Sequence, residues 1–424
     1  MSSSHVKYVL VGGGAASGAA AIAIRQRDPE GSILLVGQEV NRPYHRPALS
    51  RDYLLRQTHR RQLFTVADQW FAENRVQLCT GRRASSLDTA RHAVLLDNGQ
   101  DVAYEQLLIA TGGSPVHMRV PGSDLPNVFY LRTLEDADRV RNAVEKARQE
   151  GKRHELGRGG AAVIGGGLLG IELAGTFAQM GLAVKLIEAG AWPWCQFAGE
   201  TVGRLVARRL EKRGVSVHLQ TAPVRIDGDG RVQRMTLSSG MLLELDLLVA
   251  AIGLTPHKEL LRATAIASEN AVLVDEHCRT SVADVYAAGD CAAIYDPLFA
   301  RHRWIDHWEM ATETGRIAGL NMAGDDVKYD QVNCHTTQVL DLSASIWGES
   351  RHISHRIVRG MTSMESPDFI EIGVDNSGRI SHVVAINHAN ENDTLRELVR
   401  RRLNANEHDA VLRDPSRSLA GLLR

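Results

Sequence analysis

The stretch VLVGGGAASGAAAIAI, residues 9–24, decides the fold. Residues 7–11 are mostly apolar, as in a buried strand, and the small residues 18–24 are typical of a helix that packs closely on a sheet. The glycines between them predict a tight turn that brings backbone N–H groups against a pyrophosphate at the helix N-terminus. Ser17 stands at the third glycine position of this motif as another small residue. The stretch therefore predicts the first turn of a dinucleotide-binding fold.

The same pattern recurs further along the chain. Residues 161–164 predict a strand, residues 165–170 read GGGLLG and complete a full GxGxxG motif, and residues 171–180 predict a helix. One such motif is weak evidence, but two copies in the same strand–turn–helix–strand setting indicate two dinucleotide sites. Two sites in one chain favour a flavin nucleotide in one and a nicotinamide nucleotide in the other.

An acidic residue follows the second strand of each copy. In the first copy the strand expected at 32–36 leads to Gln38 and Glu39, which compete for the hydroxyl groups of the adenosine ribose. In the second copy the strand at 183–187 ends at Glu188. A carboxylate there accepts hydrogen bonds from a free ribose 2′-OH and repels a 2′-phosphate, so NADH is favoured over NADPH.

The composition predicts a soluble protein of two or three domains. The chain has 424 residues, of which 44% are hydrophobic and 23% charged, and its formal charge is −1, so no global charge points to nucleic acid or to a membrane surface. Its five cysteines are scattered without a CxxC pair, which favours reduced thiols in the cytoplasm over disulfides or a zinc site. The apolar residues 8–24 are interrupted by glycines, and we interpret them as strand, turn and helix rather than as a signal peptide. We expect no metal and no membrane span.

Five further motifs make the chain similar to a known family. They are LIATGG at 108–113, YLRTLEDA at 130–137, AAIGLTP at 250–256, VYAAGD at 285–290 and LRDPSRSL at 412–419. With them the chain resembles the FAD-dependent pyridine-nucleotide reductases. Within these, it is similar to the oxygenase-coupled ferredoxin and rubredoxin reductases, which are related to apoptosis-inducing factor.

The resemblance implies an α/β fold with two Rossmann-like domains and a C-terminal α+β domain. It predicts a FAD-binding domain at 1–117 and 246–325, interrupted by a NAD-binding domain at 118–245, and a C-terminal domain at 326–424. It also implies which residues bind FAD and NADH, and Asp290 among them is expected to hold the ribityl and pyrophosphate region. The expected cofactor-binding residues are Gly12, Gly14, Ala15, Ala16, Ser17, Gln38, Glu39, Arg46, Arg51, Ala84, Ala110, Thr111, Gly112, Arg132, Gly165, Gly167, Leu168, Leu169, Gly170, Glu172, Glu188, Gly253, Asp290, His307 and Trp308.

The segment NRPYHRPALSR at 41–51 has no cysteine where related disulfide reductases carry a redox pair. It is similar to the PYxRPPLSK segment of the oxygenase-coupled branch, in which Arg46 would lie against the FAD phosphates. Arg51 replaces the lysine of that branch and is expected to pair with Glu172 as the catalytic pair beside the flavin, although an ordinary structural ion pair is the alternative. Cys79 and Cys195 are interpreted as core or loop thiols. Without a redox thiol, electrons would pass singly to an iron–sulfur protein.

Several interpretations stay open at this point. The arginines within 42–61 either form a docking patch for an acidic ferredoxin or rubredoxin, or belong to a solvated surface. His307 is either a packing residue or a proton donor, and the pair Trp192 and Trp194 either stacks on adenine or covers a domain edge. A redox-sensing oxidoreductase like apoptosis-inducing factor and a reductase of a small quinone or of monodehydroascorbate are the alternative functions. Both a monomer and a homodimer are compatible with the sequence.

Overall fold

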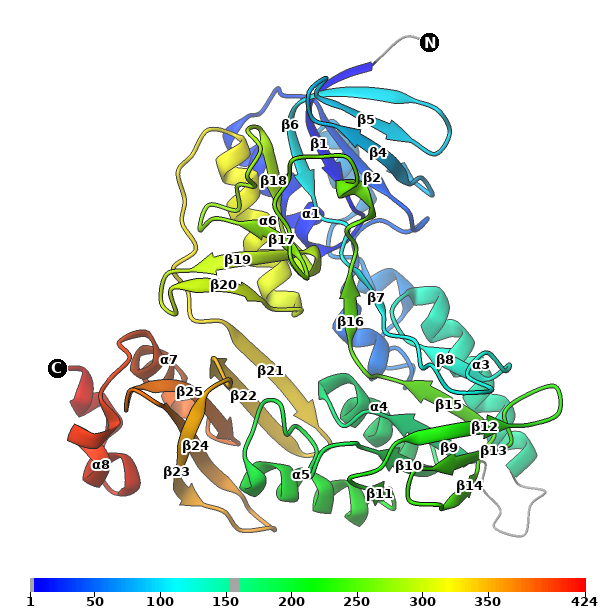
Figure 1. Ribbon diagram of the computed structural model, residues 1–424, viewed down its shortest axis with the longest axis vertical. Helices are drawn as coiled ribbons and strands as arrows, with labels where there is room; N and C mark the ends of the chain where they lie inside the picture. The colour runs from blue at the N-terminus through cyan, green and yellow to red at the C-terminus, as the bar shows by residue number, and fades with distance from the viewer. Residues whose placement is uncertain (1–3, 152–159) are drawn as a thin grey trace. The chain divides into compact units, whose positions relative to one another are not determined.

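The computed structural model describes residues 4–151 and 160–424 (Figure 1). The chain divides into two compact units, each of which is built from separate segments of the sequence. Unit 1 comprises Met1–Pro47, Thr58–Ser114 and Leu254–Gln331. Unit 2 comprises Ala48–Gln57, Pro115–Gly253 and Val332–Arg424.

The core of unit 1 is a seven-stranded sheet. Its strands are β1 (Ser4–Val11), β2 (Ile33–Gly37), β3 (Val76–Thr80), β4 (Ala84–Asp88), β5 (Ala93–Leu96), β6 (Asp101–Ile109) and β18 (Val285–Ala287). The order is β3-β2-β1-β6-β5-β4, with β18 also paired to β6. Strands β3, β2, β1, β6 and β18 run parallel, and β4 and β5 are antiparallel additions. Strands β2 and β18 are buried along their whole length, as are residues 8–11 of β1 and 107–109 of β6, as expected for parallel strands covered on both faces.

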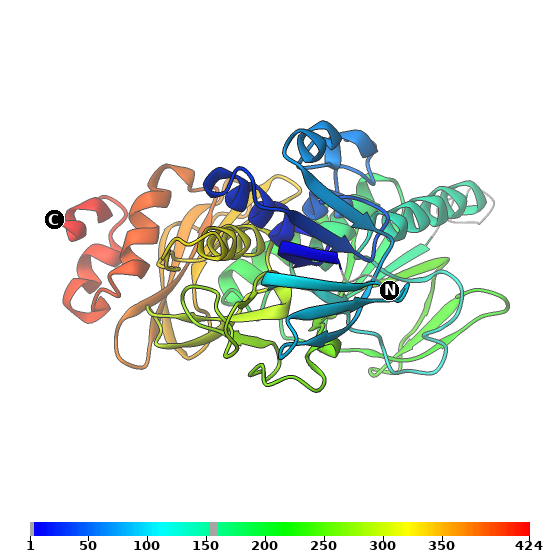
Figure 2. The same ribbon diagram turned by 90° about the horizontal axis from the view of Figure 1, so that it is seen from above.

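Helices α1 (Ala15–Arg27) and α6 (Trp308–Met322) pack side by side in unit 1 (Figure 2). A Cβ added at Gly315 would lie 2.2 Å from the carbonyl oxygen of Ala16, and one added at Gly319 would lie 2.6 Å from that of Ala20. The two glycines of α6 are therefore needed for its close contact with the backbone of α1. Unit 1 also contains α2 (Asp68–Glu73) and a three-stranded sheet of β17 (Val272–Val274), β19 (Ala292–Asp296) and β20 (Arg301–Trp304).

The first half of unit 2 is a five-stranded parallel sheet in the order β11-β10-β9-β15-β8. Its strands are β8 (Val128–Tyr130), β9 (Gly160–Ile164), β10 (Ala183–Ile187), β11 (Ser216–His218) and β15 (Leu247–Ala250). Its helices are α3 (Leu134–Gly151), α4 (Leu168–Gln179) and α5 (Glu200–Lys212). A small antiparallel sheet contains β12 (Pro223–Asp227), β13 (Arg234–Leu237) and β14 (Leu242–Glu244). Strands β7 (Gly113–Pro115) and β16 (Leu254–Pro256) pair where the chain leaves and re-enters unit 1.

The second half of unit 2 is an antiparallel sheet in the order β21-β22-β25-β24-β23. It is built from β21 (Cys334–Val339), β22 (Leu342–Gly348), β23 (Ile353–Met361), β24 (Asp368–Asp375) and β25 (Ile380–Ile386), and is followed by α7 (Asn392–Arg400) and α8 (Ala405–Arg413). The buried carboxylate of Glu371 joins this sheet to α5, because it accepts a hydrogen bond from the Gly199 amide at 2.7 Å and pairs with Arg356 at 2.9 Å.

The structure confirms the α/β class with two Rossmann-like sheets and a C-terminal α+β segment that the sequence predicted. In the part of the chain that the structure describes, no helix has the length and apolar character needed to cross a membrane. Within those same residues, no three His, Cys, Asp or Glu side chains gather in a way that could hold a metal ion.

Candidate cofactor-binding sites

The first glycine loop lies between β1 and α1 in unit 1. Gly12 has a φ of 134°, and a Cβ added there would lie 1.9 Å from the carbonyl oxygen of Ala110, so no other residue fits. Gly14 caps the N-terminus of α1, and a Cβ added there would meet no atom within 4 Å. The N-terminus of α1 therefore has free space beside Gly14, and the first N–H groups of a helix have no partner within the helix, so a pyrophosphate can be accommodated there. The turn predicted from the sequence is confirmed.

Three neighbouring parallel strands end beside this loop. The Ala110 amide donates to the Val11 carbonyl at 2.8 Å, and the Ala288 amide donates to the Ile109 carbonyl at 3.0 Å. The loops after β1, β6 and β18 therefore meet at the carboxyl edge of the sheet. They carry the expected cofactor residues Gly12, Gly14, Ala110, Thr111, Gly112 and Asp290. This edge is where open α/β sheets bind nucleotides.

Asp290 is held at this edge through its backbone. The Trp304 indole donates to the Asp290 carbonyl at 2.8 Å, and the Gly289 amide donates to the Thr314 hydroxyl oxygen at 3.0 Å. Ser17 of α1 is fully buried below the same edge, and its hydroxyl has no hydrogen-bond partner among the described residues. Its small side chain therefore fits the tight helix packing expected at this position.

Glu39 lies at the end of β2 and binds two side chains of the 41–51 segment. It accepts hydrogen bonds from the Tyr44 hydroxyl at 2.6 Å and from Arg46 at 2.5 Å, whereas Gln38 is exposed. Burial works to lower the pKa of Arg46, but Tyr44 and Glu39 outweigh it and raise that pKa, with a further contribution from Asp290. The structure thus places Arg46 on the carboxylate beside the glycine loop, and its contact with FAD phosphates stays a prediction.

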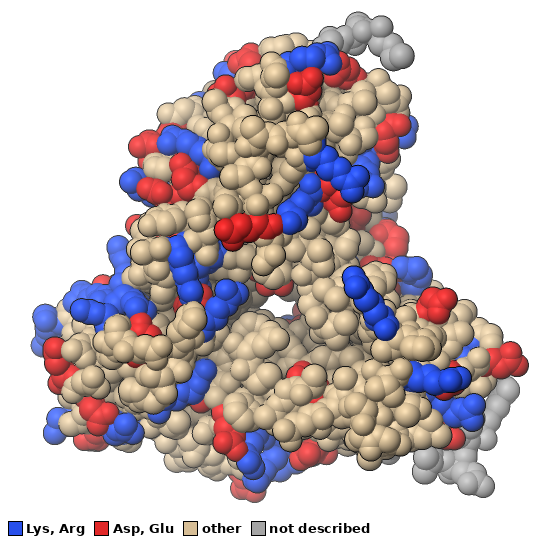
Figure 3. Space-filling view, viewed as in Figure 1, with Lys and Arg blue, Asp and Glu red and all other residues tan. Residues whose placement is uncertain are grey.

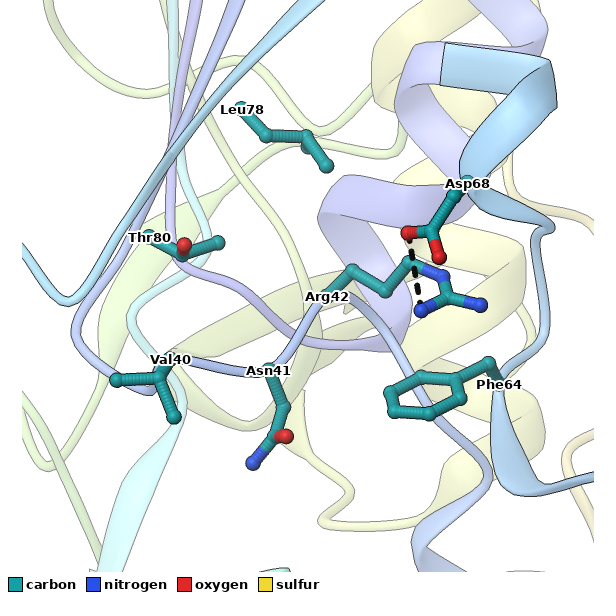
Figure 4. Close-up of a pocket in the computed structure, with 7 residues that line it drawn as sticks. All are labelled: Val40, Asn41, Arg42, Phe64, Asp68, Leu78 and Thr80. Atoms are coloured by element: carbon teal, nitrogen blue, oxygen red, sulfur yellow. Dashed lines mark ion pairs between the residues drawn. The ribbon is translucent and has the colours of Figure 1, made fainter. Parts of the chain in front are cut away.

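Unit 1 contains a pocket of about 180 Å³ that is lined in part by the residues after Glu39 (Figure 4). Arg42 crosses it, 3.8 Å from the centre of the Phe64 ring, and forms an ion pair with Asp68 at 3.0 Å. The residues that line the pocket are Val40, Asn41, Arg42, Phe64, Asp68, Leu78 and Thr80. Its volume is below the ~300 Å³ at which ligand pockets usually begin, so it can enclose only a fragment of a dinucleotide.

The other residues expected to contact FAD lie in three places. His307 caps α6 and pairs with Glu309, and Trp308 meets the ring of His45 edge-on at 4.9 Å. Ala84 begins β4 opposite Leu96. Arg132 is in unit 2, where its amide donates to the Asp136 carboxylate at the start of α3.

The second glycine loop, in unit 2, repeats the geometry of the first. A Cβ added at Gly165 would lie 2.3 Å from the Ala251 carbonyl oxygen, and one added at Gly170 would lie 1.9 Å from that of Gly165. At Gly167, the N-cap of α4, an added Cβ would meet nothing within 4 Å. Leu168 and Leu169 begin the first turn of α4, whose N–H groups have no partner within the helix. Gly253, with a φ of 121°, follows the neighbouring strand β15.

Glu188 ends β10 and is fixed on this loop. One carboxylate oxygen accepts the Gly166 amide and the other accepts the Gly190 amide. The Trp194 amide donates to the Gly166 carbonyl at 2.8 Å, and the Trp194 side chain is buried. The Trp192 indole donates to the Ala198 carbonyl at 3.2 Å. These contacts favour the interpretation that the two tryptophans cover a domain edge.

The predicted ion pair between Arg51 and Glu172 is wrong. Arg51 Nε donates to Asp52 Oδ1 at 2.8 Å, and this hydrogen bond is the main cause that raises the pKa of Arg51, while Glu172 acts on it only through its electric field. Glu172 instead accepts hydrogen bonds from the hydroxyls of Ser50 at 2.6 Å and Thr337 at 2.8 Å. Asp52 binds the Arg51 guanidinium because it is the next residue in the chain and its carboxylate is within hydrogen-bond distance.

All five cysteines are free thiols. Burial raises the pKa of Cys79, and burial together with Glu188 raises the pKa of Cys195. Both thiols are therefore protonated and weakly nucleophilic at neutral pH, which supports their interpretation as structural residues.

Several contacts of the predicted site residues were not foreseen from the sequence. Tyr44 binds Glu39, Thr337 binds Glu172, and His257 binds Thr111. The Tyr44 contact is short-range, but the other two join segments that are more than a hundred residues apart, so no local pattern could reveal them.

The fold and the two loops define an α/β protein with two dinucleotide sites in one chain. Residues 6–315 match the family described as pyridine nucleotide-disulphide oxidoreductase, and the chain belongs to this family. Membership confirms an oxidoreductase with FAD and NAD(H) as its cofactors.

Individual relatives match almost the whole chain. The ferredoxin–NAD(+) reductase component of the anthranilate 1,2-dioxygenase system of Burkholderia cepacia is 29% identical over 405 residues, which are 92% of this chain and 93% of the relative. The rubredoxin–NAD(+) reductase of Pseudomonas putida is 31% identical over 317 residues, which are 74% of this chain and 80% of the relative. Among solved structures, the covalent putidaredoxin reductase–putidaredoxin complex matches with a TM-score of 0.89 and 27% identity, over 99% of this chain and 98% of that chain.

Proposed function

We propose that the protein is an NADH-dependent flavoprotein reductase that passes electrons from NADH through FAD to a ferredoxin or rubredoxin of an oxygenase system. The observation that carries this proposal is the presence of two open glycine loops, each at the carboxyl ends of the parallel strands of its own sheet, in a chain whose 41–51 segment has no redox cysteine. The names of relatives that match most of the chain give the class of acceptor.

Bound FAD supplies the conversion of a two-electron donor into one-electron steps. In the overall reaction NADH and two oxidised carriers give NAD⁺, one proton and two reduced carriers. The chain's own residues bind and orient. The loop at Gly12 and Gly14 holds the FAD pyrophosphate, the loop at Gly165 and Gly167 holds that of NADH, and Glu188 selects the free ribose hydroxyl.

Arg51 and Glu172 remain the residues proposed to act beside the flavin, but each acts with its own partners and not as an ion pair. Glu172 is oriented by two hydroxyl groups, and the charge of Arg51 is balanced by Asp52. Within this proposal the FAD domain comprises 1–117 and 246–325, the NAD domain 118–245 and the C-terminal domain 326–424. We also propose that the protein works in the cytoplasm, where its five free thiols would stay reduced.

The arginines of 42–61 do not carry a free positive charge as a group. Arg42 pairs with Asp68, Arg46 with Glu39, Arg51 with Asp52 and Arg56 with Glu145. On the face drawn in Figure 3, basic and acidic side chains are interspersed. These pairings favour the solvated surface over a single steering patch for the carrier.

Anaerobic stopped-flow mixing of the yellow protein with NADH, and separately with NADPH, tests the proposal. Rapid bleaching by NADH, slow bleaching by NADPH and cytochrome c reduction that requires an added ferredoxin are expected. Slow bleaching into a long-lived charge-transfer complex, with cytochrome reduction indifferent to ferredoxin, would contradict the proposal and favour a redox sensor.

A further inference from the structure

His257 forms hydrogen bonds with the loop that follows β6. It comes directly after β16, where the chain has just re-entered unit 1, and it lies against residues 111–114, where the chain is about to leave. The ring Nδ1 is 2.9 Å from the Thr111 carbonyl oxygen, and Nε2 is 2.6 Å from the Ser114 hydroxyl oxygen. The backbones are joined as well, because the His257 amide donates to the Gly112 carbonyl at 2.9 Å.

The partners of the ring determine which nitrogen carries the proton. A carbonyl oxygen can only accept, so Nδ1 must donate to Thr111. In the neutral ring Nε2 is then the acceptor, and the Ser114 hydroxyl donates to it. His257 therefore uses both nitrogens on one short segment, and each bond has a distinct chemical replacement.

The segment that His257 holds belongs to the nucleotide edge of unit 1. Gly12 of the first glycine loop packs against the carbonyl oxygen of Ala110, the residue before Thr111, and this contact leaves no room for a side chain at Gly12. On the other side, the Cys291 thiol contacts the carbonyls of Ile109 and Ala288 at 3.4 Å. Cys291 thus contacts the end of β6, and His257 holds residues 111 and 112 directly after it. A shift of the Thr111 peptide would move the neighbouring Ala110 carbonyl, against which Gly12 packs.

We propose that His257 is a positioning residue for the flavin nucleotide, which acts through the Thr111 carbonyl to keep the loop after β6 in its binding conformation. The proposal rests on the FAD site described above and needs neither a particular carrier nor a particular rate with NADH. His257 itself is not placed in contact with the cofactor. Its effect should therefore appear in how firmly FAD is held.

Two substitutions separate the two ring bonds. Asparagine places an amide N–H near the position of Nδ1 and can keep the bond to Thr111, whereas glutamine places its amide near Nε2 and can keep only the bond to Ser114. The holoenzymes of His257→Ala, His257→Asn and His257→Gln would be diluted, and the rise of free-flavin fluorescence would give the rate of FAD release. Unfolding of each variant would be followed separately by tryptophan fluorescence.

We expect His257→Ala and His257→Gln to release FAD about tenfold faster than the parent, as the loss of one internal hydrogen bond implies, and His257→Asn to release it at nearly the parent rate. Unchanged release from His257→Ala, or rescue by glutamine instead of asparagine, would overturn the proposal. If the release rates of the variants changed only in proportion to their unfolding temperatures, His257 would have a structural role alone and the proposal would be wrong. Because FAD release involves no carrier, a failure of ferredoxin reduction would be seen separately.

Discussion

At the scale of single residues, the Glu188 carboxylate is oriented by hydrogen bonds from the backbone. Both of its carboxylate oxygens are occupied by amides of the turns beside it, from Gly166 and Gly190. Glutamine has nearly the same shape but only one acceptor oxygen and no charge. We expect Glu188→Gln to lower the ratio of kcat/KM for NADH to that for NADPH by at least about tenfold, the range of one charge-assisted hydrogen bond.

Steady-state kinetics with both nucleotides would measure this ratio. Glu200→Gln is the matched control, because Glu200 is an exposed carboxylate on α5 paired only with Arg204 in the described residues. An unchanged ratio in Glu188→Gln would show that nucleotide selection lies elsewhere in unit 2.

Thr337 tests the proposed role of Glu172. Its hydroxyl is one of two that hold the Glu172 carboxylate, and valine has the same shape without that donor. Hydrogen bonds to charged groups are worth roughly 1.5–3 kcal/mol, so we expect Thr337→Val to slow the reduction of bound flavin by NADH about tenfold or more. Stopped-flow bleaching measures this rate, and the exposed neighbour Thr336→Val is the control. Equal rates in both variants would contradict the proposed role of Glu172 beside the flavin.

His388 predicts a pH dependence of stability. Burial lowers its pKa, but hydrogen bonds to Glu391 and Asp368 outweigh burial and raise the pKa above its ordinary value. A raised pKa in the folded state stabilises the protein fully below pH ~6.5, and the stabilisation is lost as pH rises through the folded-state value. We expect His388→Gln to lower the free energy of unfolding by about 1 kcal/mol at pH ~5.5 and by much less at pH ~9.

Urea unfolding at both pH values measures this difference. The exposed His352→Gln should show no comparable difference between them. A loss for His388→Gln that is equal at both pH values would mean that the ring acts by packing alone.

At the scale of elements, the contact of α1 with α6 depends on glycine. Alanine at Gly315 would place a methyl group 2.2 Å from the Ala16 carbonyl oxygen, a backbone atom of a buried helix. Overpacking of this kind costs about 1–3 kcal/mol, so we expect Gly315→Ala to lower the free energy of unfolding by at least about 2 kcal/mol. Urea unfolding measures the loss, and Gly421→Ala, where an added Cβ meets nothing within 4 Å, should show none. Equal stability of both variants would contradict the packing argument.

The same scale explains what the sequence could reveal. The two glycine turns and the position of Glu188 directly after β10 were predictable because each arises within one strand–turn–helix–strand unit. The partners of Glu172 were not, because Ser50 and Thr337 lie 122 and 165 residues from it in the chain. Arg51 was misassigned because resemblance implied a distant carboxylate, while a neighbouring one was available. His257 was missed for the same reason as Thr337, since its partner lies 146 residues away.

At the scale of the whole molecule, the balance of charge predicts how the carrier docks. The formal net charge is −1, and four arginines of the 42–61 segment are already paired with acids of the same chain. Long-range attraction of an acidic carrier requires a surface with excess positive charge. Arginines paired with acids leave little such excess, and salt screens exposed charges beyond about 8 Å at physiological ionic strength. Docking of a ferredoxin should then depend mainly on short-range contacts.

We therefore expect kcat/KM for an acidic ferredoxin to fall by no more than about threefold between about 50 mM and about 500 mM NaCl. Cytochrome c reduction at limiting ferredoxin measures this, and flavin bleaching by NADH at each salt concentration controls for effects on the first half-reaction. A fall of more than about tenfold, confined to the ferredoxin-dependent step, would mean that a steering patch exists. Charge reversal at the exposed Arg61, which has no acidic partner among the described residues, would then test whether the 42–61 segment forms that patch.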